Sequence, residues 1–547
     1  MDILVINLMR LGDLIQTTPV LRCLRSQYPG SRITLAVKDL FRESAGLLPG
    51  VDRLVPFPSV SLAMLLDQEG GWPEAARLLG EWLRESFPRP PDVVVNLTPN
   101  SLGGILAYAT GAWEIRGMAA YRTWELGTRP DWASYALVVS RARQANPFNL
   151  VDLFLREGGL TPDGRGLELA VPPEAEAEVK EFWQGLQVPP GTKLVGLFPG
   201  ASKPERCWPT DRFVRTALML LDSRACHFFI FGSAKEESLG EAISQQVPAA
   251  AITSLCGRTT PAVLAAYLKR LDLLISNDTG PMHLAAAMGT PTLALFLASA
   301  RVQDTGPVGK GHVIIEPSLD CHPCLAPCPQ PGCHHAIASE AVTFWAHKLL
   351  NQERLIPVDD DTVHHPTWVY LSATDLQGYH AYLPLVRRPL GSRDFWLWLH
   401  RAAWGQVLDG STFSFSPLKE WLEMILIRHY LPPQADPGFV NGESSLSELR
   451  QAASRGEKLA VEILGLVDNG QPSPVRILQK IEALGEVDRA LRRIGVAYPE
   501  LAALVEFFSW TSGTSTVRKS PPWPRNFGRL TGGSGGSGKW PWRVWQN

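Results

Sequence analysis

Short apolar runs alternate with longer helical patterns over about the first 345 residues, and this alternation constrains the fold more than any other feature. The runs that we expect to be strands are Ile3–Ile6, Ile33–Val37, Val93–Leu97, Leu194–Phe198, His227–Phe231, Leu273–Ile275 and Thr292–Phe296. Strands that alternate with helices typically build a parallel sheet covered by helices on both faces. The sequence therefore predicts an α/β fold for this part of the chain.

The chain is long enough to need more than one domain. Its 547 residues exceed what a single hydrophobic core normally organises. Two proline clusters, Pro172-Pro173 and Pro189-Pro190, bracket a predicted helix over Glu174–Leu186. We take this segment as the interdomain link and expect a first domain over residues 1–172 and a second over 173–350.

The sequence changes character after Asp359. Aromatic residues crowd the segment Phe395–Trp398, and further along apolar residues recur at helical spacing: Leu478, Ile481, Leu484, Val487, Leu491 and Ile494. We expect a mainly α-helical accessory region over 360–520, with this stripe in its core rather than on a partner-binding face. A Gly/Ser repeat at 532–538 predicts a flexible tail over 521–547.

Composition and charge restrict the partners and the location. The formal net charge is -2, so no overall field attracts nucleic acid, and no nucleic-acid partner is expected. The start of the sequence has no basic segment or cleavage site of a signal peptide, and no apolar run reaches the roughly 18 residues of a membrane span. We expect the chain in the cytoplasm, either free or in peripheral contact with the inner face of the membrane.

The first candidate site is Arg10-Leu11-Gly12-Asp13, directly after the first predicted strand. Ligands of open α/β sheets bind beyond the carboxyl ends of the strands, where this turn lies. Gly12 allows a tight turn or a close approach of substrate. Asp13 can act as a general base, or it can cap the helix that follows. There is no GxGxxG here, which weakens a dinucleotide-dehydrogenase interpretation.

The second candidate site is the segment Phe198–Pro209, after the first strand of the second half. Ser202 and the turn amides can donate hydrogen bonds to an anionic leaving group, while Lys203 and Arg206 can neutralise its charge. The alternative is a basic surface loop.

The third candidate site is the segment Ser276–Pro291, between two predicted strands. Asn277, Asp278 or Thr279 can cap a helix that begins near Pro281, and the free N–H groups of that helix can hold a pyrophosphate. The carboxylate of Asp278 repels phosphate, so it is better suited to hold a sugar hydroxyl or to orient His283.

The order and spacing of these three sites resemble those of the ADP-heptose:lipopolysaccharide heptosyltransferases, glycosyltransferase family 9. The matching motifs are Ile3–Asp13, Thr17-Thr18-Pro19, Trp208-Pro209, Gly232–Glu237 and Asp278–Ala287. The resemblance covers about residues 1–350. It implies a GT-B architecture of two Rossmann-like, doubly wound domains, of which the first binds the acceptor and the second the nucleotide sugar.

The resemblance also implies roles for individual residues. Asp13 would be the catalytic base, on the acceptor side together with Arg10 and Gly12. The donor would be bound by Ser202, Lys203, Arg206, Glu236, Asp278, Thr279, Gly280 and His283, with Glu237 as a competitor of Glu236 for the ribose. Several members of the family carry lysine where this chain has Arg206, whose planar guanidinium places the charge differently.

The implied reaction is an inverting transfer of a heptose or related sugar. The donor would be an ADP-sugar, expected to be ADP-heptose, and the acceptor a saccharide or a lipopolysaccharide-type glycolipid. No cofactor is required, since cations and helix amides can balance the diphosphate. Two alternatives are a nucleotide-sugar epimerase of similar fold and a non-catalytic glycan-assembly protein.

Four cysteines are packed closely outside these motifs: Cys321, Cys324, Cys328 and Cys333. Four thiols at such spacings can complete a tetrahedral zinc site, although the prolines between them stiffen the segment. A structural zinc, reduced thiols and a local disulfide are the three alternatives, and a catalytic metal is not expected.

Overall fold

The structure is a computed structural model in which residues 1–120, 126–129, 131–140, 142–186, 188–324, 328, 331–359, 366–409, 416–431, 447–456, 458–459, 462, 474–498 and 504–505 are described. The described residues form two compact units. Unit 1 contains Met1–Ala133, Phe148–Arg388 and Arg428–Tyr430. Unit 2 contains Ser134–Pro147, Pro389–Ile427 and the described residues from Leu431 onward.

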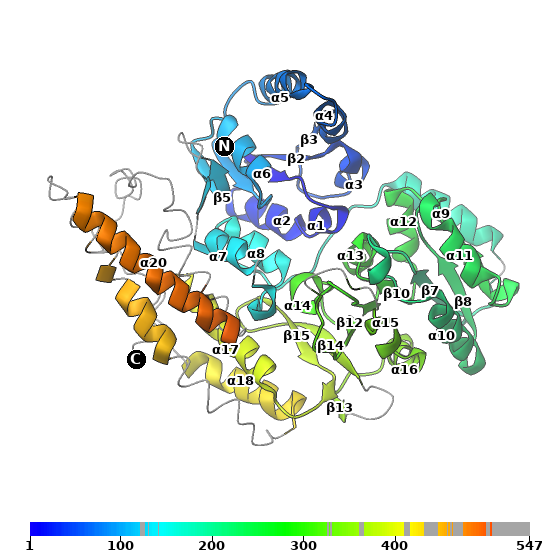
Figure 1. Cartoon of the computed structure of the whole chain (residues 1–547). Helices are drawn as coiled ribbons and strands as arrows, with labels where there is room; N and C mark the ends of the chain where they lie inside the picture. The colour runs from blue at the N-terminus through cyan, green and yellow to red at the C-terminus, as the bar shows by residue number, and fades with distance from the viewer. Residues whose placement is uncertain are drawn as a thin grey trace. The chain divides into compact units, whose positions relative to one another are not determined.

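The first sheet of unit 1 has six strands in the order β3-β2-β1-β4-β5-β6. Strands β2, β3 and β5 of this sheet are labelled in Figure 1. Their bounds are β1 Asp2–Asn7, β2 Arg32–Lys38, β3 Arg53–Phe57, β4 Val93–Asn96, β5 Glu114–Ala120 and β6 Leu126–Arg129. Strands β1 to β5 are parallel, and β6 runs antiparallel to β5. Every residue of β4 is buried, as expected for a central strand covered by helices on both faces.

Helices follow the strands of this first sheet. They are α1 Leu11–Ile15, α2 Thr18–Gln27, α3 Arg42–Ala45, α4 Ser59–Leu66, α5 Trp72–Ser86, α6 Ser101–Ala109, α7 Asp131–Val139 and α8 Leu150–Glu157. Helix α6 begins where Asn100 accepts a hydrogen bond from the amide of Gly103, an N-cap contact that stabilises the first turn. The same arrangement starts α8, where Asn149 accepts from the amide of Val151.

The second sheet of unit 1 has eight strands in the order β15-β14-β12-β11-β10-β7-β8-β9. Their bounds are β7 Lys193–Phe198, β8 Cys226–Ile230, β9 Ile252–Ser254, β10 Leu273–Asn277, β11 Thr292–Leu295, β12 Val313–Pro317, β14 Thr367–Thr374 and β15 His380–Pro384. Strands β7 to β12 are parallel, and β14 and β15 extend the sheet as antiparallel strands. The helices of this half are α9 Pro173–Gly185, α10 Thr210–Ser223, α11 Glu237–Ser244, α12 Pro261–Leu268, α13 Gly280–Ala287, α14 Val302–Thr305, α15 Cys333–Ala336 and α16 Ser339–Leu350.

The predicted α/β fold class is confirmed. Each of the seven predicted strands is present, with bounds that differ by at most two residues. In each sheet, successive strands are added on both sides of the first strand, which is β1 in one sheet and β7 in the other. This is the doubly wound order of a Rossmann-like domain.

The accessory region begins later than expected. We expected mainly helical structure from residue 360, but β14 and β15 form a hairpin that pairs with β12 and so belongs to the second sheet. The segment Thr367–Thr374 begins with four β-branched or aromatic residues in succession, Thr367 to Tyr370, which suits a strand. The boundary between the two units falls at Arg388.

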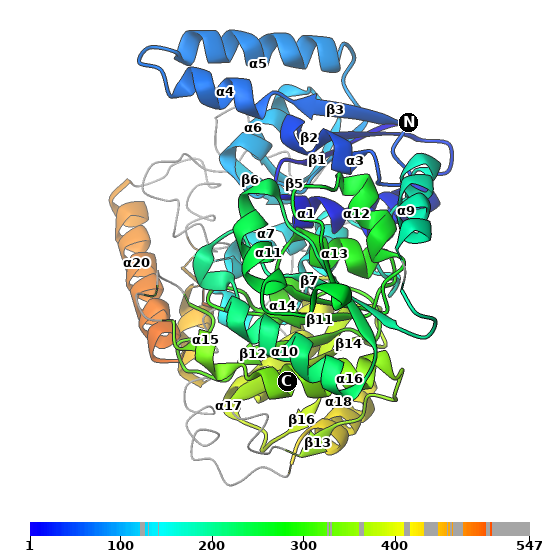
Figure 2. The same cartoon turned by 90° about the vertical axis from the view of Figure 1, so that its right-hand side faces the viewer.

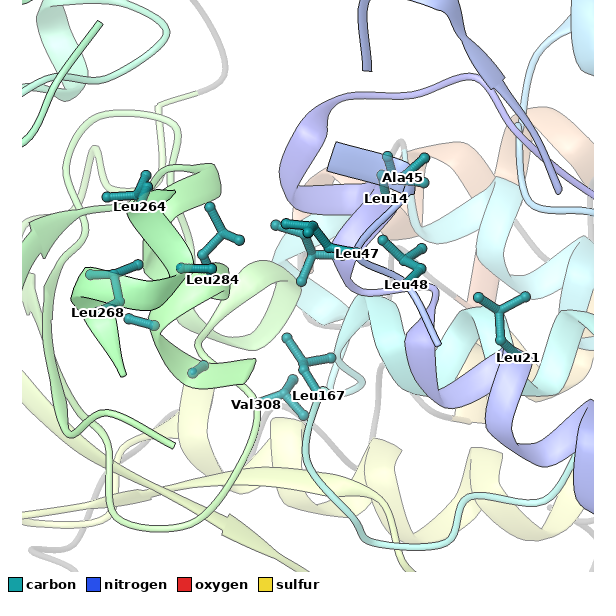
Figure 3. Packing of buried hydrophobic residues seen from close by; sticks show 14 of the residues in the cluster. Leu14, Leu21, Ala45, Leu47, Leu48, Leu167, Leu264, Leu268, Leu284 and Val308 are labelled. Atoms are coloured by element: carbon teal, nitrogen blue, oxygen red, sulfur yellow. The ribbon is translucent and has the colours of Figure 1, made fainter. Parts of the chain in front are cut away.

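The two sheets of unit 1 share apolar packing beside the turn after β1 (Figure 3). Leu14 of α1 and the segment Ala45–Leu48 belong to the same cluster of buried side chains as Leu264 of α12 and Leu284 of α13. Because burial of such side chains is a main stabilising contribution, this cluster holds α1 and α13 against each other. The turns that carry the first and third candidate sites therefore lie close together.

Unit 2 is mainly helical in its described part. Its principal helices are α17 Ser392–Val407, α18 Ser416–His429 and α20 Pro474–Ala497 (Figure 2). Trp396 packs with Val487, Leu491 and Ile494, so these three members of the predicted stripe lie in a core as expected. The other stripe side chains and the tail predicted over 521–547 lie outside the described residues. None of the helices in the described ranges has the length and apolar character that a membrane crossing requires.

Candidate active site

The turn after β1 is built around the backbone of Asp13. Asn7, the last residue of β1, donates from Nδ2 to the carbonyl oxygen of Asp13 at 3.1 Å and to Thr17 Oγ1 at 2.7 Å. The Thr17 hydroxyl in turn donates to the same carbonyl at 3.1 Å. These bonds fix the first helical turn to the carboxyl end of β1.

The Asp13 side chain combines the two roles that the sequence leaves open. Its Oδ2 accepts a hydrogen bond from the backbone N–H of Arg10 at 3.1 Å, a contact that caps the start of α1. A carboxylate has a second oxygen and further lone pairs, so this contact still allows Asp13 to accept a proton. Capping and base function are therefore compatible in this geometry.

The groups around Asp13 change the pKa of its carboxyl group. Burial raises the pKa of Asp13, the backbone hydrogen bond and the charge of Arg10 lower it, Asp278 raises it and Arg206 lowers it. A raised pKa makes a carboxylate a stronger base, while the two guanidinium groups favour its ionised form. Both Asp278 and Arg206 come from the second sheet, so the charge environment of this side chain is formed by both halves of unit 1.

Arg206 and Asp278 form an ion pair with little solvent exposure. Their side chains are 13% and 6% exposed, and the Arg206 guanidinium contacts the Asp278 carboxylate. Arg206 also donates from Nη2 to the carbonyl oxygen of Asp278 at 3.1 Å and from Nη1 to Ser202 Oγ at 3.2 Å. The structure thus brings together the second and third candidate sites. Lys203 is half exposed and lies 3.9 Å from the carboxylate of Glu205.

Asn277 connects these two sites through hydrogen bonds that the sequence did not reveal. Its Nδ2 donates to the carbonyl of Pro199 at 2.7 Å, and its Oδ1 accepts from the backbone N–H of Trp208 at 3.0 Å. Asn277 therefore does not cap α13. Thr279 occupies the N-cap position with an extended backbone, and the helix begins at Gly280, close to the predicted start.

Glu236 lies between the loops that follow β7 and β8. Its Oε2 accepts hydrogen bonds from the backbone N–H and the hydroxyl of Ser233, at 2.7 and 2.8 Å. A Cβ placed on Gly200 would lie 1.7 Å from Oε1 of Glu236, so only glycine fits at position 200 with Glu236 in this place. The carboxylate is thereby held at the carboxyl edge of the second sheet, where ligands of open α/β sheets bind.

His283 is buried between the two halves of unit 1. A Cβ placed on Gly12 would lie 2.9 Å from Cδ2 of His283, and Nε2 of His283 is 3.4 Å from Nε2 of Gln16. Burial, with Arg206 and His312 as smaller causes, lowers the pKa of His283 to about 3, so the ring is neutral at physiological pH. Gln16 was not predicted; a polar residue inside an otherwise apolar helical stretch is the signal that could have found it.

Comparison with known proteins shows which proteins this chain is similar to. The model of glycosyltransferase family 9 (heptosyltransferase) matches residues 160–334. Lipooligosaccharide heptosyltransferase 2 of Haemophilus influenzae is 26% identical over 310 residues, which are 54% of this chain and 83% of that protein. The match to the family model covers 175 of the 547 residues, and the similarity to this relative covers a longer stretch.

Two further similarities describe how much of the chain resembles known proteins. Lipooligosaccharide heptosyltransferase 2 of Campylobacter jejuni is 31% identical over 173 residues, so the chain spans about half of that relative, 53% of its length. The crystal structure of a family 9 glycosyl transferase from Veillonella parvula covers 64% of this chain and 97% of its own, with 24% identity and a TM-score of 0.51. This likeness is one of fold, and unit 1 accordingly has the predicted GT-B architecture of two Rossmann-like domains.

The cysteine cluster predicted from the sequence is present as free thiols. Within the part of the chain that the structure describes, which includes all four cysteines, no three His, Cys, Asp or Glu side chains are arranged to hold a metal ion. Cys321 is exposed, Cys333 is buried, and all four are free thiols. The thiols lie near one another, since burial raises the pKa of Cys324 and Cys321, Cys333 and Cys328 all raise it further. Of the three alternatives, the structure contains the reduced thiols.

The segment that contains the cysteines contacts the candidate site instead. The backbone N–H of Cys324 donates to the carbonyl of Ala298, in the loop after β11, at 2.9 Å. The imidazole Nε2 of His334 lies 2.8 Å from the carbonyl oxygen of Glu205, in the loop that carries Arg206. The segment thus supports two loops at the carboxyl edge of the second sheet.

Proposed function

We propose that the chain is an inverting glycosyltransferase that moves a heptose or a related sugar from an ADP-sugar to a saccharide or a lipopolysaccharide-type glycolipid. The observation that carries the proposal is the placement of Asp13, from the first sheet, beside Arg206 and Asp278, from the second. A base that lies near a cation suits a reaction that deprotonates an acceptor and releases an anion.

The proposed chemistry is a single displacement. Asp13 takes the proton of the acceptor hydroxyl as the oxygen forms a bond to the anomeric carbon of the donor sugar. The bond between that carbon and the diphosphate oxygen breaks, its electron pair leaves with ADP, and the configuration at the anomeric carbon inverts. The raised pKa of Asp13 supports this role, because it strengthens the base.

The second sheet supplies the groups that would bind the donor. Ser202 and Arg206 would contact the diphosphate together with the N–H groups of Thr279 and Gly280 at the start of α13, and Lys203 would add charge at its exposed side. Glu236 would hold the ribose. Asp278 would contact the sugar, since its carboxylate repels phosphate, and His283 would support α13 from inside.

No cofactor enters the proposal, because the cations and the helix N–H groups can balance the charge of the leaving diphosphate. The relatives named above are lipooligosaccharide heptosyltransferases, which supports an acceptor of this kind. A lipid-linked acceptor would bring the enzyme to the inner surface of the membrane.

The proposal is tested by incubating the purified full chain with ADP-heptose and measuring ADP release with and without a heptose-deficient lipopolysaccharide acceptor. We expect release that depends on the acceptor, no release from GDP- or UDP-sugars, and an inverted anomeric configuration in the product. The variant Asp13→Asn should be slower by about 100-fold or more, since general-base catalysis contributes on that order. The variant Asp67→Asn, at an exposed acid after α4, is the matched control.

The two alternatives predict different results. A nucleotide-sugar epimerase would convert the donor without any acceptor. A non-catalytic assembly protein would bind ADP-heptose without turnover, and Asp13→Asn would change nothing. Absence of ADP release from every ADP-sugar would overturn the donor assignment.

A further inference from the structure

Gln16 lies directly after the helix that carries Asp13, and its side chain is completely buried. Its Nε2 reaches the carbonyl oxygen of Gly12 at 3.3 Å and the imidazole Nε2 of His283 at 3.4 Å. A single side-chain amide therefore contacts both the turn of the proposed base and the helix of the proposed donor site.

The protonation state of His283 decides how this contact works. The pKa of His283 is lowered to about 3, mainly by burial, so the ring is neutral and one of its nitrogens accepts. With the Gln16 amide in this orientation its Nε2 donates, so the Nε2 of His283 accepts and the proton of the neutral ring resides on Nδ1. The contact thus selects one tautomer and one orientation of the ring.

The two helices approach unusually closely at this point. A Cβ on Gly12 would lie 2.9 Å from Cδ2 of His283, and a Cβ on Gly280 would lie 3.0 Å from Cδ2 of Leu11. A side chain of each helix thus packs against the glycine of the other helix, so the surfaces of α1 and α13 interdigitate. A hydrogen bond between two such closely packed helices fixes their alignment more strictly than apolar contacts do, because apolar packing tolerates small shifts.

Polar atoms without partners surround this contact. Among the described residues, Gln16 Oε1, His283 Nδ1 and Arg206 Nε are buried and have no hydrogen-bond partner. A buried polar atom without a partner lowers the stability of a fold, so apolar side chains here would serve folding better. The presence of a glutamine at position 16 is therefore better explained by a role in the candidate active site than by a contribution to folding.

We propose that Gln16 is a positioning residue for sugar transfer: through His283 it sets the alignment of the Asp13 turn with the N-terminus of α13. This inference rests on the proposed function, in which Asp13 is the base and α13 binds the donor. Gln16 touches neither substrate. It acts by holding the base at the distance from the anomeric carbon that the displacement needs, and a misplacement of about 1 Å can reduce the rate on the order of 100-fold.

The test replaces Gln16 with methionine, which keeps the length of the side chain and removes its hydrogen-bonding groups. The matched control is Gln27→Met, at an exposed position of α2. We expect Gln16→Met to lower kcat by about 10- to 100-fold while the Kd for ADP, measured by calorimetry, stays within about 3-fold. Gln27→Met should leave both quantities unchanged.

Three outcomes would overturn a positioning role. One is a Gln16→Met enzyme that keeps its kcat within about 2-fold. Another is a parallel loss of kcat, ADP binding and thermal stability, which would mean a purely structural role. The third is a wild-type chain that binds ADP but transfers no sugar, which overturns the proposed function as well. An active wild-type enzyme with an equally active variant overturns only the role of Gln16.

Discussion

Asp278 and Arg206 form one ion pair, yet they act in opposite directions on the same neighbour: Asp278 raises the pKa of Asp13 and Arg206 lowers it. The proposed base belongs to the first sheet and the ion pair to the second. Its basicity therefore depends on groups that the donor site itself supplies, and each partner of the pair gives a prediction with a defined sign.

Replacing Arg206 with alanine should shift the acid limb of the rate profile to higher pH. The substitution removes a cation that lowers the pKa of Asp13 and leaves Asp278 uncompensated, and both changes raise that pKa. The KM for the donor should also rise about 10- to 100-fold, as expected for the loss of hydrogen bonds to a charged group. The measurement is kcat/KM as a function of pH.

The variant Arg206→Lys is the matched control for this prediction. It keeps the positive charge, so the acid limb should stay near its wild-type position, while the loss of the planar guanidinium still weakens the contacts with Ser202 and Asp278. If the two variants showed the same pH profile, the charge of Arg206 would not control the base.

Replacing Asp278 with asparagine should shift the acid limb in the other direction. The change removes a negative charge that raises the pKa of Asp13, so the base should ionise at lower pH. Asparagine has nearly the same shape and keeps a carbonyl oxygen for Arg206. The measurement is again kcat/KM against pH, and a shift to higher pH would contradict the proximity of the two carboxylates.

Much of the fold could be predicted from the sequence, because the central strands are short apolar runs bounded by turns. Strands such as β1 and β10 are buried on both faces, so they are recognised in the sequence as continuous apolar runs. The hairpin of β14 and β15 was not predicted, because it follows the point at which the strand–helix alternation of the sequence ends. Pairing with β12, a contact distant in sequence, decides where these residues belong.

The candidate site could be predicted only in part. Loops after strands point to Asp13, Arg206 and Asp278, since the topology of a parallel sheet places them at one edge. The contacts between the two halves depend on packing in three dimensions, which no local pattern encodes. For this reason the neighbours of His283, namely Gly12 and Gln16, became visible only in the structure.

The β14–β15 hairpin gives a prediction on stability. The hydroxyl of Tyr382 donates to the carbonyl of Gly306 at 2.8 Å and accepts from Asn149 Nδ2 at 2.8 Å, so it connects α8 of the first half with the second sheet. Tyr382→Phe leaves these buried partners without the hydroxyl and should lower the free energy of unfolding by about 1 to 3 kcal/mol. Chemical denaturation measures the change.

The control for the hairpin is Tyr108→Phe, at a position of α6 where the side chain is 38% exposed. Because solvent can replace a partner there, we expect little change. An equal effect of the two substitutions would mean that the hydroxyl of Tyr382 contributes no specific link between the halves.

Gly200 tests the placement of Glu236. A Cβ at position 200 would lie 1.7 Å from Oε1 of Glu236, so Gly200→Ala must displace the carboxylate from Ser233. If Glu236 holds the ribose, the KM for the donor should rise about 10-fold or more, in line with a lost hydrogen bond to a charged group.

Gly185→Ala is the control for Gly200, since a Cβ there meets no atom within 4 Å. It should leave the KM for the donor unchanged. A normal KM in Gly200→Ala would remove Glu236 from the donor site.

From the burial of His312 we predict how the free energy of unfolding depends on pH. The residue lies just before β12 and is 4% exposed, and burial lowers its pKa to about 4. An unfolded chain therefore binds a proton at His312 between about pH 6.5 and 4, whereas the folded chain does not. Since the unfolded state binds more protons in this window, the free energy of unfolding falls as the pH falls, by at most about 3 kcal/mol from this residue.

The variant His312→Leu should remove this contribution, so its free energy of unfolding should fall less steeply than that of the wild type between pH 6.5 and 4. Urea denaturation at a series of pH values measures the two slopes. His335→Gln, at an exposed position, should keep the wild-type slope. Equal slopes for the wild type and His312→Leu would mean that His312 titrates in the folded chain as it does in the unfolded one, which its burial argues against.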